Sequence, residues 1–265
     1  MPIQHERVKS VASLIKRISE LRTEWNSADG LYFDPWFRGQ ARKAWALSPS
    51  LYRRDISLAS EEDMRSEFMR RGVQLTNGPS HTGEWAWYFL QQHYGCPTRL
   101  LDWTDSALVA LFFAINSNHP SEIDVDSDAA VWMIDPWWLN QQALGRKSIV
   151  LSDWEEAQPY LPKLYSNRAL RRRYPIAIDP PHLDRRVAVQ RSRFTIHGSH
   201  RNGFESLARK AGARLVCISI ARSSIDTMRI DLATCGITDA VLFPDLQGLS
   251  RDLERNEQAN WFDIS

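Results

Sequence analysis

The sequence predicts a single compact α+β domain in which helices flank a mixed or antiparallel sheet. Helical and strand-like segments follow one another irregularly along 265 residues, without the strand–helix–strand repeat of a doubly wound sheet. Hydrophobic residues make up 43% of the chain and charged residues 25%, as in globular proteins with a sizeable core. We expect residues 1–30 to form an N-terminal helical segment and residues 31–265 the α+β domain.

The first part of the chain predicts three helices and one strand. Apolar residues recur at helical spacing over 8–26, so an amphipathic helix is expected there. Residues 31–40 (LYFDPWFRGQ) carry aromatic side chains in loose alternation, which favours a strand. Two more helices are expected over 60–74 and 83–94, and the glycine and proline that follow end the second.

The most apolar helix is expected to begin near Ala107. Residues 107–115 (ALVALFFAI) are apolar on nearly every face, which is typical of a helix at the centre of a fold. Asp105 or Ser106 can cap its first turn. This helix should therefore support whatever the preceding polar residues form.

The second half of the chain predicts strands separated by loops and short helices. Residues 116–128 are polar and acidic and indicate an exposed loop. Residues 129–135 (AAVWMID) predict a buried strand that ends at Pro136, and 137–166 predict helical pieces with loops. The remaining elements are expected as strands over 193–198 and 214–220, a helix from Ser223 or Ser224 to Gly236, a last strand over 239–245, and a short helix over 249–254.

The bulk composition narrows the classes of function. A formal net charge of +1 gives no overall attraction to nucleic acid or to a membrane surface. The cysteines, Cys96, Cys217 and Cys235, show no metal-ligand spacing, and a low, odd number favours a reducing compartment. There is no apolar run of the ~20 residues that span a bilayer, and no signal-peptide core at the start. We therefore expect a cytoplasmic protein without a membrane partner.

Polar and ionisable residues gather just before the apolar helix. His93, Arg99, Asp102 and Thr104 lie within residues 91–105, which we expect to form a turn that presents them to one cleft. Capping of the helix by Asp102 and Thr104, with Arg99 paired to an internal carboxylate, is the structural alternative. Capping explains one aspartate but not the whole group, so we favour a ligand-binding floor.

Arg38 is a second candidate because it precedes Gly39 at the end of a predicted strand. Such an arginine can hold a phosphate through paired hydrogen bonds, while the glycine leaves room for the ligand to approach the backbone. Alternatively, Arg38 is a buried arginine in an ion pair with Asp102 or Asp105. The sequence leaves both interpretations open.

Four sequence blocks resemble the signature of the FRG domain family, a largely bacterial family named for a Phe-Arg-Gly motif. The second block is long and specific, and together the blocks span residues 36–249. They are WFRGQ (36–40), QQHYGCPTRLLDWTDSALVALFFA (91–114), QRSRFTIHG (190–198) and GITDAVLFPDLQGL (236–249).

The order of these blocks is similar to that of ADP-ribosyltransferases of the Arg-Ser-Glu type. That resemblance implies a split sheet, NAD as substrate, and ADP-ribosyltransferase-like or NAD glycohydrolase activity in a bacterial toxin or phage-defence effector. Arg38 would hold the NAD phosphates, Thr104 would stand in the middle motif, and Asp239 would replace the glutamate that steadies the ribosyl cation. The chain has neither the Ser-Thr-Ser nor the Glu-x-Glu of that family.

The resemblance and the residue patterns together give two sets of candidate site residues. The expected catalytic residues are Arg38, His93, Asp102, Asp239 and Asp245. The expected nucleotide-binding residues are Arg38, Gly39, Gln40, Tyr94, Arg99, Trp103, Thr104 and His197. We expect no metal cofactor.

Two other classes of function remain open. Residues 163–193 contain nine basic and two acidic side chains, so a nucleotide- or nucleic-acid-binding module without catalysis is possible, with this segment as its contact face. His93, Asp102, Asp239 and Asp245 could instead form the site of a metal-dependent nuclease, although no HExxH-type spacing supports a metal. In each case a protein or nucleic-acid target, an antitoxin or a regulatory partner is conceivable.

Overall fold

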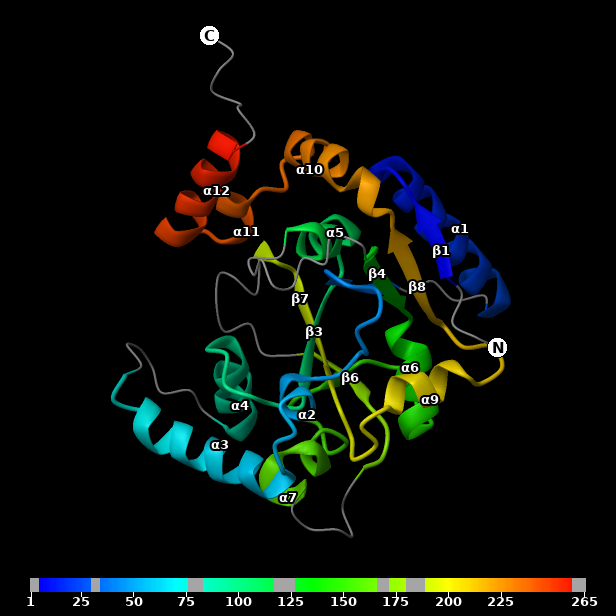
Figure 1. Cartoon of the computed structure of the whole chain (residues 1–265). Helices are drawn as coiled ribbons and strands as arrows, with labels where there is room; N and C mark the ends of the chain where they lie inside the picture. The colour runs from blue at the N-terminus through cyan, green and yellow to red at the C-terminus, as the bar shows by residue number, and fades with distance from the viewer. Residues whose placement is uncertain are drawn as a thin grey trace.

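The structure, a computed structural model, describes residues 5–29, 34–75, 83–116, 127–165, 172–179 and 189–258. Helices flank an open, mixed sheet of eight strands (Figure 1), which confirms the predicted α+β class. The strands lie in the order β1-β8-β4-β2-β3-β7-β6-β5. Their bounds are β1 His5–Val8, β2 Trp36–Gln40, β3 Leu100–Thr104, β4 Ala129–Ile134, β5 Val150–Leu151, β6 Ile176–Asp179, β7 Ser192–Ile196 and β8 Leu215–Ile220.

Helices make up the rest of the regular structure. In Figure 1, α1, α10 and α5 lie together at one end, and α3, α4 and α7 lie at the other. The α-helices are α1 Val11–Asp29, α2 Ser50–Arg53, α3 Leu58–Gly72, α4 Glu84–His93, α5 Ala107–Ile115, α6 Pro136–Leu144, α7 Pro162–Tyr165, α9 Gly203–Ala208, α10 Ile225–Thr234, α11 Asp239–Leu242 and α12 Leu246–Gln258, and the short 3-10 turns are η2 Gln158–Tyr160 and η4 Arg222–Ser224. None of the helices in the described part of the chain is long and apolar enough to cross a membrane.

The sheet is mainly antiparallel, with parallel pairs at its two ends. β1 runs parallel to β8, and β5 runs parallel to β6, whereas the remaining neighbours are antiparallel. Because successive residues of a strand point to opposite faces, β4 contributes to two apolar clusters. Val131 and Met133 pack with α1, α5 and α10, and Trp132 packs with α6 and α9. The sheet is therefore covered on both faces.

Helix α5 packs directly on β2, as its apolar sequence predicts. Ser106 caps it, because its hydroxyl accepts a hydrogen bond from the backbone N–H of Val109. A Cβ added at Gly39 would lie 1.9 Å from the carbonyl oxygen of Ala110 and 2.5 Å from the backbone nitrogen of Ala114. Only a glycine allows the helix to approach the strand this closely.

Most predicted elements are confirmed within a few residues, but two are wrong. Residues 100–104 are not part of a turn: they form the central strand β3, paired with β2 on one side and β7 on the other. Residues 239–245 do not form a strand: α11 and the segment that leads into α12 occupy them. Both runs are short, and a short apolar run does not distinguish a helix or turn from a strand.

Other differences concern segment ends. Strands β1, β5 and β6 are not foreseen in the sequence, and Ser224 precedes α10 without a side-chain capping bond. Residues 117–126 of the predicted acidic loop lie outside the described residues. The division at residue 30 stays a prediction, although β1 pairs with β8 and α1 packs in the same apolar cluster as α5.

Candidate functional site

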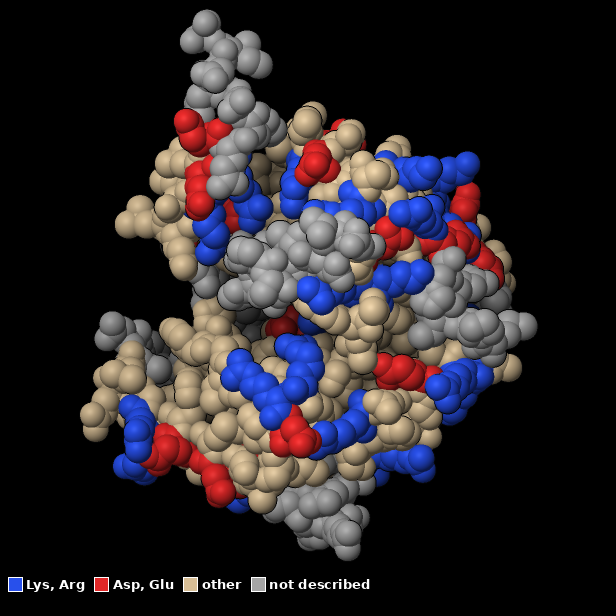
Figure 2. Space-filling view, viewed as in Figure 1, with Lys and Arg blue, Asp and Glu red and all other residues tan. Residues whose placement is uncertain are grey.

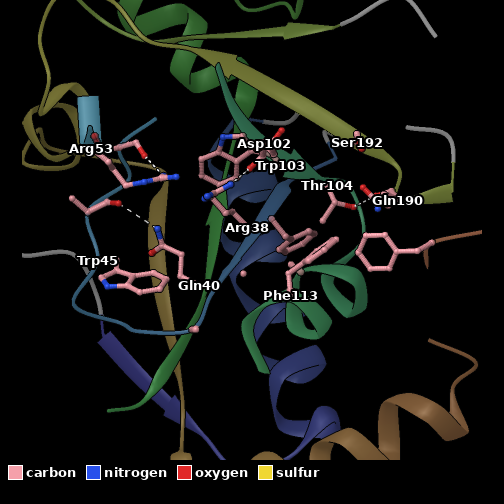
Figure 3. Close-up of a pocket in the computed structure, with 17 residues that line it drawn as sticks. Arg38, Gln40, Trp45, Arg53, Asp102, Trp103, Thr104, Phe113, Gln190 and Ser192 are labelled. Atoms are coloured by element: carbon pink, nitrogen blue, oxygen red, sulfur yellow. Dashed lines mark hydrogen bonds between the residues drawn. The ribbon is translucent and has the colours of Figure 1, made fainter. Parts of the chain in front are cut away.

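A pocket of about 620 Å³ opens where β2 and β3 part (Figure 3). These strands meet at a single pair, Phe37 with Thr104, whereas β2 pairs with β4 along its whole length. Pockets that hold small ligands in proteins have volumes of roughly 300–1,000 Å³. The described residues that line this pocket are Phe37, Arg38, Gly39, Gln40, Ala41, Trp45, Ala46, Ser48, Arg53, Asp102, Trp103, Thr104, Ala110, Phe113, Gln190, Ser192 and Phe243.

Arg38 lies in the middle of this pocket. Its Nη1 donates a hydrogen bond of 2.6 Å to the backbone carbonyl of Asp102, so the side chain bridges the gap between the strands. Its Nε is buried and has no hydrogen-bond partner among the described residues. Burial lowers the pKa of Arg38 to about 10; the negative charge of Asp102 opposes this shift, and the positive charge of Arg53 adds to it. The guanidinium is therefore charged at neutral pH.

Arg53 supplies a second guanidinium to the same pocket. It ends α2, and its Nη1 donates to the carbonyl of Ser48 at 2.6 Å. Neither Arg53 nor Arg38 forms an ion pair with a carboxylate in the described part of the chain. The alternative in which Arg38 pairs with Asp105 is therefore wrong, because Asp105 pairs with arginines of β7 and the residue before it. Two like charges in one concave site favour an anionic ligand.

Asp102 is the one carboxylate among the described lining residues. It is exposed although β3 is a central strand, because the pocket opens beside it. The side-chain amide of Gln92, near the end of α4, donates to both carboxylate oxygens, at 3.1 Å and 2.9 Å. Arg38 contacts Asp102 only through its backbone carbonyl, so the carboxylate keeps acceptor capacity for a ligand.

Three other predicted residues line the pocket with their polar groups already bonded. The hydroxyl of Thr104 donates to the carbonyl of Gln190 at 2.8 Å and accepts from the N–H of Ser106. The indole N–H of Trp103 donates to a threonine hydroxyl of β7. The amide of Gln40 accepts from an indole N–H of β4 and donates to the carbonyl of residue 46. These side chains shape the walls of the pocket.

Gly39 also lines the pocket, and its lack of a side chain allows α5 to pack closely against β2. The space where a Cβ would lie is filled by the backbone of α5. The expectation that a ligand phosphate approaches the backbone of this glycine stays a prediction, because Gly39 lines the pocket on the side away from the helix-filled Cβ position.

Arg99 does not line the pocket, and its side chain bonds to groups inside the protein. It is fully buried and forms an ion pair of 2.7 Å with Glu61, whose other oxygen accepts from the hydroxyl of Tyr88. Its remaining donors reach the backbone carbonyls of His197 and Tyr160. Arg99 thus links α3 and α4 to the start of β3. This agrees with the structural alternative, in which Arg99 is paired with an internal carboxylate.

His197 is also buried and does not line the pocket. Its Nε2 is 3.0 Å from the carbonyl oxygen of Leu47, and its ring contacts the edges of Tyr52 and Phe204. Burial lowers the pKa of His197 to about 3, and the positive charges of Arg99 and Arg38 add to that shift. The imidazole is therefore neutral at physiological pH and packs as part of the core.

His93 and Tyr94 lie at the end of α4, outside the described lining. Tyr94 is 70% exposed, and its ring meets the ring of His93 edge to face. The acidic candidates near the C-terminus lie elsewhere too. Asp239 is buried and pairs with two arginines of α12, and Asp245 accepts a hydrogen bond from the N–H of Gly248 at 2.8 Å. The structure does not bring these four residues together with Arg38.

Several lining residues carry no signal in the local sequence. Figure 3 shows Trp45 on one side of Arg38 and Phe113 on the other, and Phe113 meets the ring of Phe243 edge to face at 6.1 Å. Gln190 joins the pocket wall to α11, because its amide donates to the carbonyl of residue 242 at 3.1 Å. These residues come from distant parts of the chain, so only the folded structure places them at one site.

Basic side chains lie on two sides of a hollow on this face of the molecule (Figure 2). The hollow lies between the α11–α12 end and the α3–α4 end, with Lys and Arg on both sides. Of the predicted basic segment 163–193, residues 166–171 and 180–188 lie outside the described part. Arg191 and Arg193 within it pair with Asp105. The described residues contain no cluster of three potential metal ligands from His, Cys, Asp and Glu.

Comparison with known families covers the part of the chain that carries β2, the α2–α4 helices, β3 and α5. Residues 34–122 match the family model of the FRG domain. They include Arg38, Arg53, Gln92 and Asp102, whereas the blocks at 190–198 and 236–249 lie outside the match. No curated protein and no solved structure matches the chain. The chain therefore carries an FRG domain.

Proposed function

We propose that the pocket at Arg38 and Arg53 binds a nucleotide through its phosphates. The observation that carries this proposal is the pair of guanidinium groups, which face one pocket without a carboxylate partner among the described residues. A phosphate would accept hydrogen bonds from these guanidinium groups and relieve the repulsion between the two cations.

The apolar part of the lining suits the remainder of a nucleotide. Trp45 and Phe113 are each 37% exposed and flank Arg38 on opposite sides (Figure 3). Exposed aromatic rings offer a flat surface on which a base can stack. Phosphate-binding cations beside such rings match a nucleotide better than they match an inorganic anion or a simple sugar.

We further propose that NAD is the substrate and that Asp102 is the catalytic carboxylate. Cleavage would break the bond between C1′ of the ribose and the nicotinamide nitrogen, and the electron pair would leave with nicotinamide. Asp102 would stabilise the positive charge that develops on the ribose. Water, or a nucleophile of a target macromolecule, would then add at C1′ and release a proton. Asp239 and Asp245 lie outside the pocket, so Asp102 takes the role expected of them.

This activity would suit a bacterial toxin or phage-defence effector, because NAD loss or target modification harms the cell in which it occurs. The test is incubation of the purified protein with labelled NAD, with and without cell lysate, while nicotinamide release and label transfer are measured. Asp102→Asn should reduce turnover at least ~100-fold, as expected for loss of an electrostatic catalytic group. The matched control is Asp153→Asn, an exposed aspartate outside the pocket. Full turnover in Asp102→Asn would contradict this role.

A nucleotide-binding module without catalysis is the second candidate. It is favoured by the polar groups of Gln40, Trp103 and Thr104, which are already bonded within the protein and so are not free to act on a substrate. If NAD binds but stays intact in every preparation, this candidate replaces the first.

A further inference from the structure

Gln92 forms hydrogen bonds to the carboxylate of Asp102, and binding of a phosphate by the two arginines does not need these bonds. Its Nε2 donates to both carboxylate oxygens of Asp102. Gln92 is at the end of a helix, whereas Asp102 is in the centre of the sheet. Through this amide, the position of α4 determines how the carboxylate of Asp102 is oriented in the pocket.

Thr98 fixes which way the Gln92 amide points. The Thr98 hydroxyl accepts a hydrogen bond from the backbone N–H of Leu100 at 3.1 Å, and it donates its own proton to the side-chain amide oxygen (Oε1) of Gln92. The amide oxygen must then face Thr98, and the amide NH₂ must face Asp102. Thr98 is itself fully buried and held through its backbone by Ser50 and Leu51. The series of hydrogen bonds from Thr98 through Gln92 to Asp102 thus begins at a residue that is held in place.

The pocket consequently presents two cations and one oriented carboxylate. The cations, Arg38 and Arg53, suit phosphate, and Asp102 suits a donor such as a sugar hydroxyl. An oriented carboxylate beside a phosphate site suits a ligand in which a sugar follows the phosphates. A plain nucleoside diphosphate has no second sugar beyond its phosphates that could donate to this carboxylate.

We propose that Gln92 is a positioning residue that turns Asp102 toward the sugar hydroxyls of a nucleoside diphosphate sugar. The proposal rests on the proposed nucleotide binding, because the phosphates place the sugar. The Gln92 amide and the Thr98 hydroxyl do not contact the ligand. They act by holding the carboxylate in one orientation, so their loss should affect only ligands that carry the second sugar.

The experiment compares two probes, ADP and ADP-ribose, by isothermal titration calorimetry. In wild type we expect ADP-ribose to bind at least ~10-fold more tightly than ADP, as expected for hydrogen bonds to a charged group. Gln92→Leu should remove most of that preference and leave the ADP affinity within ~2-fold. Retained ADP binding also shows that the variant is folded. Gln247→Leu, an exposed glutamine of α12, is the matched control and should keep the preference.

Two variants of Thr98 test the same series of hydrogen bonds at the residue that orients Gln92. Thr98→Ser keeps the hydroxyl and should keep the preference for ADP-ribose, whereas Thr98→Val should lose it. Equal affinity of wild type for the two probes, or a preference that survives Gln92→Leu, overturns the role of Gln92 while nucleotide binding stands. Binding of neither probe overturns the proposed function itself, and this inference with it.

Discussion

Replacing Gly39 by alanine should destabilise the fold strongly, because the new methyl group would meet backbone atoms that cannot rotate away. Its Cβ would lie 1.9 Å from the oxygen of Ala110 and 2.5 Å from the nitrogen of Ala114. Ordinary contacts are at ~3.5 Å, so α5 would have to retreat by about 1.6 Å to relieve the tighter of these contacts. Overpacked cores lose ~1–3 kcal/mol, and here the most apolar helix must shift, so we expect about 3 kcal/mol.

The assay is thermal and urea unfolding of wild type, Gly39→Ala and Gly145→Ala. For a domain of this size, ~3 kcal/mol corresponds to a decrease in Tm of roughly 6–12 °C. Gly145 has φ 73° and nothing within 4 Å of an added Cβ, so its alanine variant suffers only backbone strain, which costs about 1–2 kcal/mol. A smaller loss in Gly39→Ala than in Gly145→Ala would refute the packing role of Gly39.

Buried ionisable groups give three further predictions. Glu61→Gln leaves the guanidinium of Arg99 buried without its carboxylate and should cost ~3–5 kcal/mol in urea unfolding; a loss under ~1 kcal/mol would show that the pair is not buried in solution. Burial lowers the pKa of His197 from 6.5 to about 3, so below pH 6.5 the unfolded chain binds a proton that the folded protein does not. Stability should thus fall with decreasing pH by up to ~1.4 kcal/mol per pH unit from this group, and His197→Gln should show a shallower slope between pH 7 and 5; identical slopes would contradict the shift. Burial raises the pKa of the Cys217 thiol to about 11, so a thiol reagent at pH 8 should label the exposed Cys235 quickly and Cys217 only after unfolding, as read by mass spectrometry.

The sequence predicts those elements whose pattern is long or bounded by clear signals. Residues 107–115 are apolar throughout and follow Ser106, and residues 129–134 are apolar and stop before Asp135 and Pro136. The short runs 100–104 and 239–245 carry no such signals. Tertiary pairing makes the first a strand, and α11 occupies the start of the second.

The candidate site is predicted in part for a related reason. Arg38 and Asp102 stand out as charged residues among apolar neighbours, and the structure places both at the pocket. Arg99 stands out in the same way, yet it is paired inside the protein with Glu61, a residue that lies 38 positions earlier. Arg53 carries no local signal, because only the folded chain brings it to the same pocket as Arg38. The sequence alone indicates that a charged residue lies in an unusual setting, but it does not indicate which group that residue contacts.

Calorimetric titration of NAD into wild type, Arg53→Gln and Arg54→Gln tests the central claim most directly. Arg53 and Arg54 are adjacent and exposed, but only Arg53 lines the pocket. Loss of one charge-assisted contact to phosphate costs ~1.5–3 kcal/mol, so Arg53→Gln should weaken NAD binding by roughly 10- to 100-fold while Arg54→Gln changes it by less than ~2-fold. Equal weakening in both variants, or no NAD binding by the wild-type protein, would contradict a nucleotide site at Arg38 and Arg53.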